Sequence, residues 1–295
     1  MNAGLPTIGL TLGDTAGIGP EIISAALASG RLDPKFNYRV IGSAEDARPG
    51  QASEATARAA LAALEESVTL ALSGQIAAVV TGPVHKARMQ AVGFDFPGQT
   101  EFFAHRARCE NFAMCLTGGA LTVALVTVHV PLRTVAESLT TAEIVQVGLL
   151  LAEFLRQRHG RVPRLAVAGL NPHAGEAGAF GREEIEIIEP AVALLRGELG
   201  DCAECSGPHS PDTVFHRAVG GEFDGVLCMY HDQGLIPLKL HAFDAGVNVT
   251  LGLPFPRTSP DHGTAFDIAG RGIARADSMI AAINLAAELT RQRSS

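Results

Sequence analysis

The stretch Thr7-Ile-Gly-Leu-Thr11, followed by Gly13-Asp-Thr-Ala-Gly-Ile-Gly-Pro-Glu21, indicates the fold class of this chain. The first run is short and mostly apolar or β-branched, which is typical of a strand. The glycines behind it predict a turn, and a helix is expected from about Ile18. A strand that leads through a turn into a helix is the repeating unit of a parallel α/β sheet.

Short β-rich runs and longer helical patterns alternate along the rest of the chain. Helices are expected over residues 52–72, 140–156 and 277–291. Further strands are expected at residues 38–41, 76–80, 121–128, 164–168 and 225–229. The alternation predicts an α/β fold, and 295 residues are enough for one large or two medium domains.

The composition excludes several classes of protein. The chain has 23 basic and 31 acidic residues, and this net charge of −8 argues against a nucleic-acid scaffold. A hydrophobic content of 47% excludes a disordered chain. No stretch approaches the length of a membrane span, and the first residues lack the basic and apolar regions of a secretory signal. We therefore expect a cytoplasmic protein that binds neither nucleic acid nor membrane.

Five cysteines are scattered through the chain, which suits reduced thiols better than a disulfide framework. Cys202 and Cys205 have the spacing of a redox or zinc pair. No second pair accompanies them, and the acidic neighbours Asp201 and Glu204 disfavour a thiolate. We therefore expect no function for this pair.

Histidines follow three of the predicted strands directly, at His129, His173 and His231. Ligands bind at the carboxyl ends of strands in an open α/β sheet, so three imidazoles there could converge on one divalent cation. Three protein ligands with an open position are typical of a catalytic metal. Carboxylates and amides beside two of these histidines could fix their tautomers. The alternative is that each histidine is an ordinary exposed loop residue without a ligand. This alternative is plausible for one histidine but not for three at the ends of three strands.

Several segments could bind an anion. The amides of the glycine turn at residues 13–21 could receive one, but a purely structural turn explains the spacing equally well. The chain has only three lysines, at positions 35, 86 and 239. Lys239 and Arg257 could together neutralise a phosphate or carboxylate, and we favour this over two surface cations. For Lys86 both interpretations stay open.

Seven motifs in order resemble the 4-hydroxythreonine-4-phosphate dehydrogenase family of pyridoxal phosphate biosynthesis along nearly the whole chain. They are Gly13-Asp-Thr-Ala-Gly-Ile-Gly-Pro-Glu21, Thr81-Gly-Pro-Val-His-Lys86, Thr127-Val-His-Val-Pro-Leu-Arg133, Leu170-Asn-Pro-His-Ala-Gly-Glu176, Pro211-Asp-Thr-Val-Phe215, Tyr230-His-Asp-Gln-Gly234 and Gly246-Val-Asn-Val-Thr-Leu-Gly-Leu-Pro254.

The resemblance implies oxidation of 4-phosphohydroxy-L-threonine by NAD or NADP, assisted by zinc, magnesium or cobalt. The product, 2-amino-3-oxo-4-phosphooxybutanoate, would then lose carbon dioxide to give 3-amino-2-oxopropyl phosphate. By this resemblance the three histidines are the metal ligands. Substrate contacts are implied for Gln99, Thr100, Lys239, Asn248 and Arg257. Asp212 and Lys239 are the candidate catalytic residues, and Asp212 would transfer a proton or contact the substrate amine.

Gln99 departs from the family pattern. The family typically has Gly-His-Thr-Glu where this chain has Gly98-Gln-Thr-Glu101. Glutamine can donate a hydrogen bond but cannot carry a charge or take up a proton. We therefore expect Gln99 to bind substrate without acting as acid or base, which leaves room for a related substrate such as threonate 4-phosphate.

The segment Asp261-His-Gly-Thr-Ala-Phe-Asp-Ile-Ala-Gly-Arg-Gly-Ile273 resembles the loop that holds the adenosine of NAD in isopropylmalate and isocitrate dehydrogenases. Cofactor contacts are thereby implied for His262, Gly263, Thr264, Ala265 and Asp267. The implied fold is isopropylmalate-dehydrogenase-like, with two α/β domains and a cleft between them. The first domain is expected at residues 1–95 plus 255–295, and the second, with the metal ligands and dimer contacts, at 96–254. The active site is expected at the interface of a homodimer.

Three alternatives remain at this point. The first is a dehydrogenase for another phosphorylated or dicarboxylic hydroxy acid. The second is a metal-dependent hydrolase built on the same three histidines, which would be indifferent to NAD. The third is a non-enzymatic module that binds metal or phosphate, which the spread of motifs over the whole chain disfavours.

Overall fold

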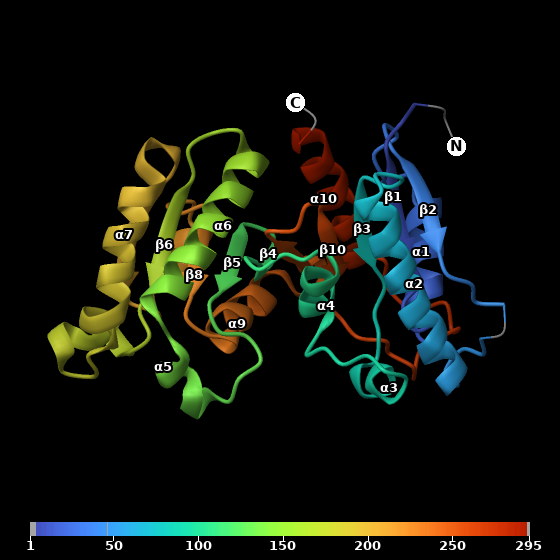
Figure 1. Cartoon of the computed structure of the whole chain (residues 1–295), viewed down its shortest axis with the longest axis horizontal. Helices are drawn as coiled ribbons and strands as arrows, with labels where there is room; N and C mark the ends of the chain where they lie inside the picture. The colour runs from blue at the N-terminus through green and yellow to red at the C-terminus, as the bar shows by residue number, and fades with distance from the viewer. Residues whose placement is uncertain (1–3, 46, 294–295) are drawn as a thin grey trace. The chain divides into compact units, whose positions relative to one another are not determined.

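The computed structural model describes residues 4–45 and 47–293 of the chain, which divides into two units (Figure 1). Unit 1 comprises Met1–Glu110 and Val247–Ser295, and unit 2 comprises Asn111–Gly246. The chain therefore passes from one unit to the other twice. The first residues are expected to lack a secretory signal, and residues 1–3 of that stretch lie outside the described residues.

The observed boundaries differ from those expected after residues 95 and 254. Helix α4 (Gln99–Arg106) belongs to unit 1, where the ring of its Phe103 lies 6.3 Å from that of Phe255. Strand β9 (Val247–Leu251) belongs to unit 1 because it pairs with β10 (Arg257–Pro260). The boundary after residue 95 misses α4 because its partner Phe255 lies about 150 residues away in the sequence. The boundary after residue 254 misses β9 because neither β9 nor β10 is predicted as a strand.

The described strands of unit 1 lie in the order β2, β1, β3, β10 and β9. The first four run parallel, and β9 is antiparallel to β10. Residues Ile8, Leu10, Val79 and Val80 have no exposed surface, as expected for parallel strands covered on both faces. The remaining strands of this unit are β1 (Thr7–Thr11), β2 (Asn37–Ile41) and β3 (Ala78–Thr81).

Helices cover the strands of unit 1 (Figure 1). Besides α4 they are α1 (Gly19–Ala28), α2 (Glu54–Leu72), α3 (Lys86–Ala91) and α10 (Asp277–Arg293). Helix α2 begins two residues later than predicted because Ser53 caps it, accepting a hydrogen bond from the amide of Thr56.

The described strands of unit 2 lie in the order β4, β5, β8, β6 and β7. Strands β4 and β5 form an antiparallel hairpin, and the others run parallel to β5. Their bounds are β4 (Ala113–Gly118), β5 (Leu121–Leu125), β6 (Arg164–Ala168), β7 (Glu204–His209) and β8 (Gly225–Cys228). The helices are α5 (Val135–Ser138), α6 (Thr141–His159), α7 (Glu189–Leu199), α8 (Val214–Val219) and α9 (His231–Ala242).

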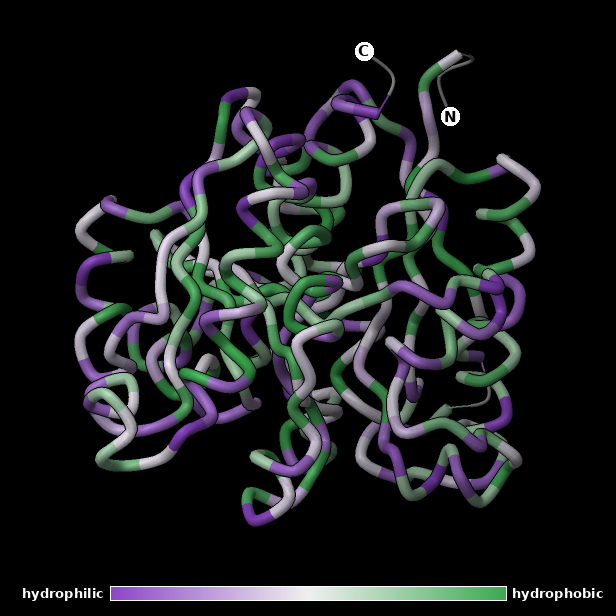
Figure 2. Tube along the Cα trace, turned by 60° about the vertical axis from the view of Figure 1, so that its left-hand side comes forward, coloured by the Kyte–Doolittle hydropathy of each residue, from purple (hydrophilic) through white to green (hydrophobic). Residues whose placement is uncertain are grey.

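The core of unit 2 is built from the inward side chains of its central strands and of helices α8 and α9. Hydrophobic stretches run through the trace of each unit (Figure 2), and the buried hydrophobic side chains come from helices as well as from strands. Among the residues the structure describes, no single helix is long and apolar enough to span a membrane. Only the bent pair Leu132–Ser138 and Thr141–His159 passes that test together, on length and composition.

The α/β class and every predicted strand and helix are confirmed, with β1 and β6 exact at both ends. The sequence patterns do not predict β4, β7, β9 or β10. Strand β10 is largely polar, and β7 contains a glycine and a proline. Such segments become strands because neighbouring strands offer them hydrogen bonds, which local sequence does not record.

Candidate functional site

Three histidines lie at the ends of adjacent strands in unit 2. Strands β5, β8 and β6 are neighbours and run parallel. Their carboxyl ends therefore meet one edge of the unit, which is where ligands bind in α/β sheets. His129, His231 and His173 follow these three strands in that order.

His129 and His231 lie side by side, with ring centroids 5.7 Å apart. The Nδ1–H of His231 donates to Oδ1 of Asp232 over 2.6 Å, which leaves the Nε2 atom of His231 open for a ligand. A cavity of about 440 Å³ opens beside both rings. Its other lining residues are Thr127, Val128, Val130, Leu132, Val135, Tyr230, Asp232 and Ile236.

His173 is exposed and does not join this pair. Its ring lies 6.2 Å from that of Phe180. Within residues 4–45 and 47–293, no three His, Cys, Asp or Glu side chains lie close enough together to hold a metal ion. One chain therefore gathers two of the three predicted ligands.

A buried side-chain amide and a buried hydroxyl connect the three strand ends that precede the histidines. Gln233 is 7% exposed; its Oε1 accepts from the amide of Met229 and its Nε2 donates to the carbonyl of Gly169, each over 2.7 Å. The hydroxyl of Thr127 donates to the carbonyl of Met229 over 2.8 Å. These residues immediately precede the segments that carry His231, His173 and His129. The spacing between the histidines' strands is thus fixed by buried hydrogen bonds.

The turn that carries His173 has an unusual backbone. Five consecutive residues, from His173 to Ala177, have positive φ angles between 44° and 79°. Four of them are not glycine, and the left-handed conformation costs such a residue about 1–2 kcal/mol. Strained conformations of this kind persist only where surrounding contacts hold them, and they cluster at functional sites.

The two candidate catalytic residues lie in unit 2. Asp212 is exposed, and the Ser210 hydroxyl donates to its Oδ1 over 2.6 Å. This bond and, to a smaller extent, the charge of His173 hold the pKa of Asp212 below its ordinary value. Asp212 is therefore a carboxylate at neutral pH within electrostatic reach of His173. Lys239 is half-buried on α9, the helix that begins with His231.

A buried cation lies in unit 1. Arg257 on β10 is 2% exposed. Its Nη2 donates to Oγ1 of Thr81 over 2.6 Å and to Oε1 of Gln99 over 2.9 Å, and its Nη1 donates to Oγ1 of Thr250 over 3.3 Å. Its guanidinium carbon lies 5.4 Å from the ring centroid of Phe103.

No carboxylate neutralises this cation directly, because none of the ion pairs among the described residues includes Arg257. Its Nε is buried without a partner, and so is Oδ1 of Asn248. Burial lowers the pKa of Arg257 to about 9, against a smaller opposing effect of the charge on Glu101. A buried guanidinium with an unpartnered Nε could bind an anionic ligand.

The predicted substrate contacts of unit 1 surround this cation. Gln99 accepts a hydrogen bond from Arg257, and Thr100 is buried with its Oγ1 3.4 Å from Oγ1 of Thr250. Asn248 lies on β9, the strand that pairs with β10. By contrast, Lys86 is exposed at the start of α3, as a surface cation would be.

The predicted cofactor loop packs on the turn between β1 and α1. The carbonyl of Thr264 accepts from the amide of Ile18 over 2.9 Å. Gly17 allows this close approach, because a Cβ there would lie 2.6 Å from the same carbonyl oxygen. Nε2 of His262 is buried without a partner, whereas Gly263 and Asp267 are exposed. The loop is therefore held in place by Thr264, and it carries polar groups that have no partner or are exposed.

Four backbone amides of the glycine turn are bonded within unit 1, which favours the structural interpretation of residues 13–21. The amide of Asp14 donates to the carbonyl of Pro83, and that of Gly17 to the carbonyl of Asp14. The amide of Ala16 donates to the Asp14 side chain. With the Ile18 amide bonded to Thr264, these donors are satisfied within unit 1 and are not offered to an anion.

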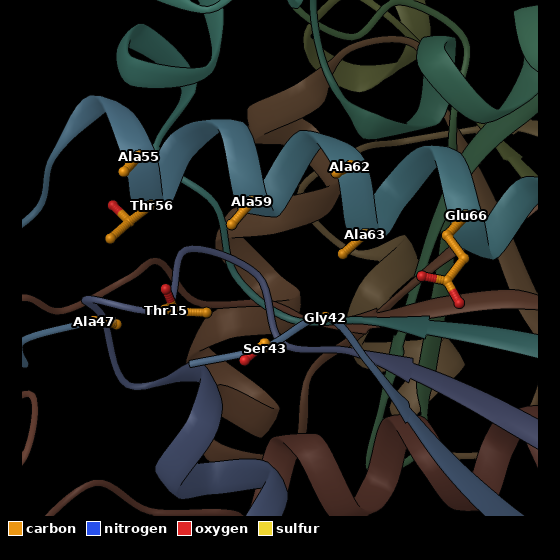
Figure 3. Close-up of a pocket in the computed structure, with 10 residues that line it drawn as sticks. All are labelled: Thr15, Gly42, Ser43, Ala47, Ala55, Thr56, Ala59, Ala62, Ala63 and Glu66. Carbon is orange, nitrogen blue, oxygen red and sulfur yellow. The ribbon is translucent and has the colours of Figure 1, made fainter. Parts of the chain in front are cut away.

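A second cavity, of about 310 Å³, was not predicted from the sequence (Figure 3). It lies in unit 1 against one face of α2, where alanines recur at positions 55, 59, 62 and 63. Small side chains at helical spacing on one face were the signal that could have indicated it. Its other lining residues are Thr15, Gly42, Ser43, Ala47, Thr56 and Glu66.

Cys202 and Cys205 show no sign of chemical activity. Both are free thiols, and burial raises the pKa of Cys205 to about 11. A thiol with so high a pKa forms little of the reactive thiolate at neutral pH. The raised pKa therefore disfavours thiolate chemistry at Cys205.

The chain matches one family model and is similar to several named proteins. The family model described as "Pyridoxal phosphate biosynthetic protein PdxA" matches residues 22–286. A 4-hydroxythreonine-4-phosphate dehydrogenase from Caulobacter vibrioides is 45% identical, covering 97% of this chain and 98% of its own. The alignment extends over 330 positions, so the relative carries insertions with respect to this chain of 295 residues.

Solved structures give the same result. The 4-hydroxythreonine-4-phosphate dehydrogenase of Klebsiella pneumoniae has a TM-score of 0.81 at 38% identity, covering 97% of this chain and 99% of its own. A terephthalate 1,2-cis-dihydrodiol dehydrogenase from Burkholderia xenovorans has a TM-score of 0.69 at 29% identity, with coverage of 96% and 98%. A β-decarboxylating dehydrogenase from Thermococcus kodakarensis, at 18% identity and a TM-score of 0.53, shares the fold, with coverage of 98% and 84%.

Replacing the bridging amide should destabilise unit 2. Gln233→Leu keeps the side-chain volume but leaves the Met229 amide and the Gly169 carbonyl buried without partners. Each such group costs about 1–3 kcal/mol, so we expect urea unfolding to show a loss of at least about 2 kcal/mol. The control is Gln157→Leu on α6, which removes only a surface bond to Glu153. A Gln233→Leu loss no larger than that of the control would contradict the bridging role.

The buried cation should lower stability and bind anions. Burial lowers the pKa of Arg257 from its ordinary value to about 9. The buried charge therefore destabilises the folded state below pH 9, and this destabilisation is relieved as the pH rises above 9. We expect sulfate, whose charge is constant in this range, to bind below pH 9 and to be lost above it. Arg257→Met should bind no sulfate in calorimetry, yet unfold at no lower temperature than the parent. Retained sulfate binding in this variant would refute the anion site.

Proposed function

The chain belongs to the PdxA family of pyridoxal phosphate biosynthetic proteins, and we propose that it oxidises 4-phosphohydroxy-L-threonine with NAD or NADP. The family and the dehydrogenase class that the seven motifs predict are confirmed by relatives named 4-hydroxythreonine-4-phosphate dehydrogenase. The observation that carries the substrate class is Arg257, a buried cation without a carboxylate partner among the described residues. A phosphorylated substrate supplies the missing anion.

The proposed reaction proceeds in two stages. Oxidation of the secondary alcohol gives 2-amino-3-oxo-4-phosphooxybutanoate. Its ketone lies β to the carboxylate, so the electron pair left by departing carbon dioxide is delocalised onto the ketone oxygen as an enolate. A proton taken up at the carbon that lost carbon dioxide then gives 3-amino-2-oxopropyl phosphate.

The residues proposed to hold a divalent cation are His129, His173 and His231. Imidazoles suit zinc and cobalt, and magnesium remains the third candidate from the family resemblance. The adjacent rings of His129 and His231, and the Asp232 carboxylate on Nδ1 of His231, support this assignment. A cation held there polarises the substrate hydroxyl and lowers its pKa, while the bound nicotinamide provides the hydride acceptor.

The chain's own residues hold the substrate and handle the proton. Arg257, with Gln99, Thr100 and Asn248, binds the phosphate or carboxylate in unit 1. Lys239, on α9 of unit 2, is proposed as a further substrate contact. Holding the substrate fixes the orientation of the reacting carbon, which is worth several orders of magnitude in rate. Asp212, a carboxylate at neutral pH, takes up a proton or binds the substrate amine.

The cofactor is proposed to bind at the loop that contains His262, Gly263, Thr264, Ala265 and Asp267. The buried, unpartnered Nε2 of His262 and the exposed Gly263 and Asp267 offer it polar contacts. The packing of Thr264 on the β1–α1 turn holds the loop in place before the cofactor arrives. We further propose that the protein works in the cytoplasm, whose reducing conditions suit its five free thiols.

A homodimer is proposed to complete the metal site. Unit 2 exposes an apolar surface patch that consists of Leu132, Ile236, Leu240 and Phe243, with exposures of 70%, 65%, 89% and 76%. Three of these recur at spacings of four and three residues along α9 and the turn behind it. Soluble monomers rarely expose a contiguous apolar patch, and Ile236 and Leu132 also line the cavity beside His129. A second copy of the chain would cover the patch and bring the third histidine to the other two.

A related dehydrogenase is the second candidate function. Gln99 cannot carry the charge or proton of the histidine typical of the family. The structural relative at 29% identity is named for a dihydrodiol substrate. A dehydrogenase for another phosphorylated or dicarboxylic hydroxy acid, such as threonate 4-phosphate, therefore belongs in the substrate panel. A three-histidine hydrolase is less favoured, because it would make no use of the cofactor loop.

The function is tested by incubating the purified protein with NAD and 4-phosphohydroxy-L-threonine. We expect NADH to form with zinc, cobalt or magnesium and a chelator to stop it, because the cation polarises the reacting hydroxyl. His173→Ala should lower metal affinity and activity together. We also expect NAD to raise the unfolding temperature by mass action.

A control variant separates site effects from general damage. His216→Ala alters a histidine on α8 outside the proposed site and should behave as the parent. Failure to form NADH with any divalent metal and any member of the substrate panel would reject the dehydrogenase proposal. Activity of the His173→Ala variant equal to that of His216→Ala would reject the ligand assignment.

The homodimer is tested by placing a charge in the apolar patch. Leu240→Glu should convert the dimer to a monomer in analytical ultracentrifugation, because the carboxylate would be buried without a partner. Leu194→Glu is the matched control, since Leu194 is also exposed but lies on α7, outside the patch. Equal sedimentation of the two variants would contradict the interface.

A mixing experiment tests whether one site draws on two subunits. His173→Ala and His231→Ala should each be inactive alone. If the two ligands of one site come from different subunits, random mixed dimers restore about a quarter of the parental sites. No recovery in proven mixed dimers would show that one chain supplies all three histidines.

A further inference from the structure

We propose that Glu184 is a positioning residue whose buried carboxylate holds the left-handed turn that presents His173. Nothing in the sequence motifs assigns this glutamate a role. The inference rests on the proposed function, because it takes His173 to be a metal ligand. It concerns how the chain prepares that ligand before any metal binds.

The contacts of Glu184 converge on the start of the turn. Glu184 is buried, with 1% of its surface exposed. Its Oε1 accepts from the backbone amides of Leu170 and Asn171, both over 2.8 Å. Its Oε2 accepts from Nδ2 of Asn171 over 3.0 Å. Three N–H donors therefore fix the two residues that lead into Pro172 and His173.

The carboxylate has no cationic partner in an ion pair among the described residues. A buried charge is costly unless hydrogen bonds compensate for the lost water. Here backbone amides provide that compensation, so the charge of Glu184 is stabilised only while the turn keeps its conformation. The carboxylate and the turn thus depend on each other.

The turn packs closely against the Glu184 carboxylate. Gly175, at the centre of the turn, has a φ of +79°, and a Cβ there would lie 2.6 Å from Oε2 of Glu184. A Cβ on Gly169 would lie 2.9 Å from Cα of Ala174 and 3.2 Å from Oε1 of Glu184. Glycines at both positions allow the backbone to close over the carboxylate.

Glu184 also occupies an unusual place in the backbone. It is the first residue of a π-helical turn, Glu184–Ile188, which leads into α7. Such turns are rare and occur often at functional sites. Its neighbour Glu183 accepts a second hydrogen bond from Nδ2 of Asn171 over 2.7 Å. The Asn171 side chain is thus bound by two carboxylates from the same turn.

Glu184 would affect how His173 is held for the metal and would take no part in the reaction itself. Four non-glycine residues in the left-handed conformation need contacts that hold them there. Without Glu184 the turn would relax toward ordinary backbone angles, and His173 would no longer be held for the metal. Groups that orient a metal ligand in this way typically change metal affinity by about 10- to 100-fold when they are replaced.

The test measures cobalt(II) binding to the metal-free full-length protein by calorimetry. We expect Glu184→Gln, which keeps the volume, to weaken cobalt binding about tenfold, and Glu184→Ala about 100-fold. Hydrogen exchange should accelerate at the amides of Leu170 and Asn171 even without metal. Gly175→Ala, which intrudes on the carboxylate from the other side, should reproduce both effects. The matched control is Glu186→Gln, in the same turn, whose carboxylate faces outward and pairs with Arg182.

The outcomes separate this inference from the proposed function. Weakened cobalt binding with faster local exchange in the Glu184 variants, and neither in Glu186→Gln, supports the positioning role. If His173→Ala abolishes cobalt binding while Glu184→Gln and Glu184→Ala bind cobalt like the parent, the inference is overturned and the metal site stands. If His173→Ala itself binds cobalt like the parent, the metal assignment fails first, and the exchange rates alone then report on the turn. Unchanged exchange in both Glu184 variants overturns the inference in every case.

Discussion

The hydrogen bonds of Gln233 are the constraint on which the rest of unit 2 depends. One buried amide joins the end of β8 to the end of β6, and Thr127 joins the end of β5 to the same point. Parallel strands place their carboxyl ends at one edge, but they do not by themselves fix how the segments beyond them run. The bonds of Gln233 and Thr127 hold the points at which the segments with the three proposed metal ligands leave the sheet.

Unit 1 contains a buried charge that no ion pair among the described residues neutralises. Arg257 is buried among hydroxyls and an amide and lacks a neutralising carboxylate within the described residues. Such a charge destabilises the unliganded protein, as its lowered pKa shows. An anionic substrate would supply the missing charge. The two units therefore divide the proposed work: unit 1 provides the main anion site and the cofactor loop, and unit 2 provides the metal ligands.

The sequence predicted the strands with continuous apolar runs, such as β1 and β6, because burial on both faces imposes that pattern. It also predicted the placement of three histidines at strand ends, since a strand end is a local feature. It did not predict β10, whose residues are polar, although this strand carries Arg257. The polar side chains of β10 are tolerated in the interior because they find partners on other elements. Arg257 bonds to Thr81 on β3 and Thr250 on β9, and Thr258 bonds to the carbonyl of Ala282 on α10. The local sequence of β10 does not record these partners.

By itself, then, the sequence determined the α/β class, the family, and the residue types available for metal, substrate and cofactor. Only the tertiary structure decided which of them meet. It brought His129 and His231 together and left His173 apart on a left-handed turn, and it satisfied the amides of the glycine turn internally. The physical reason is that motifs record which groups are present, whereas burial, strain and hydrogen-bond partners arise from contacts between segments far apart in the chain.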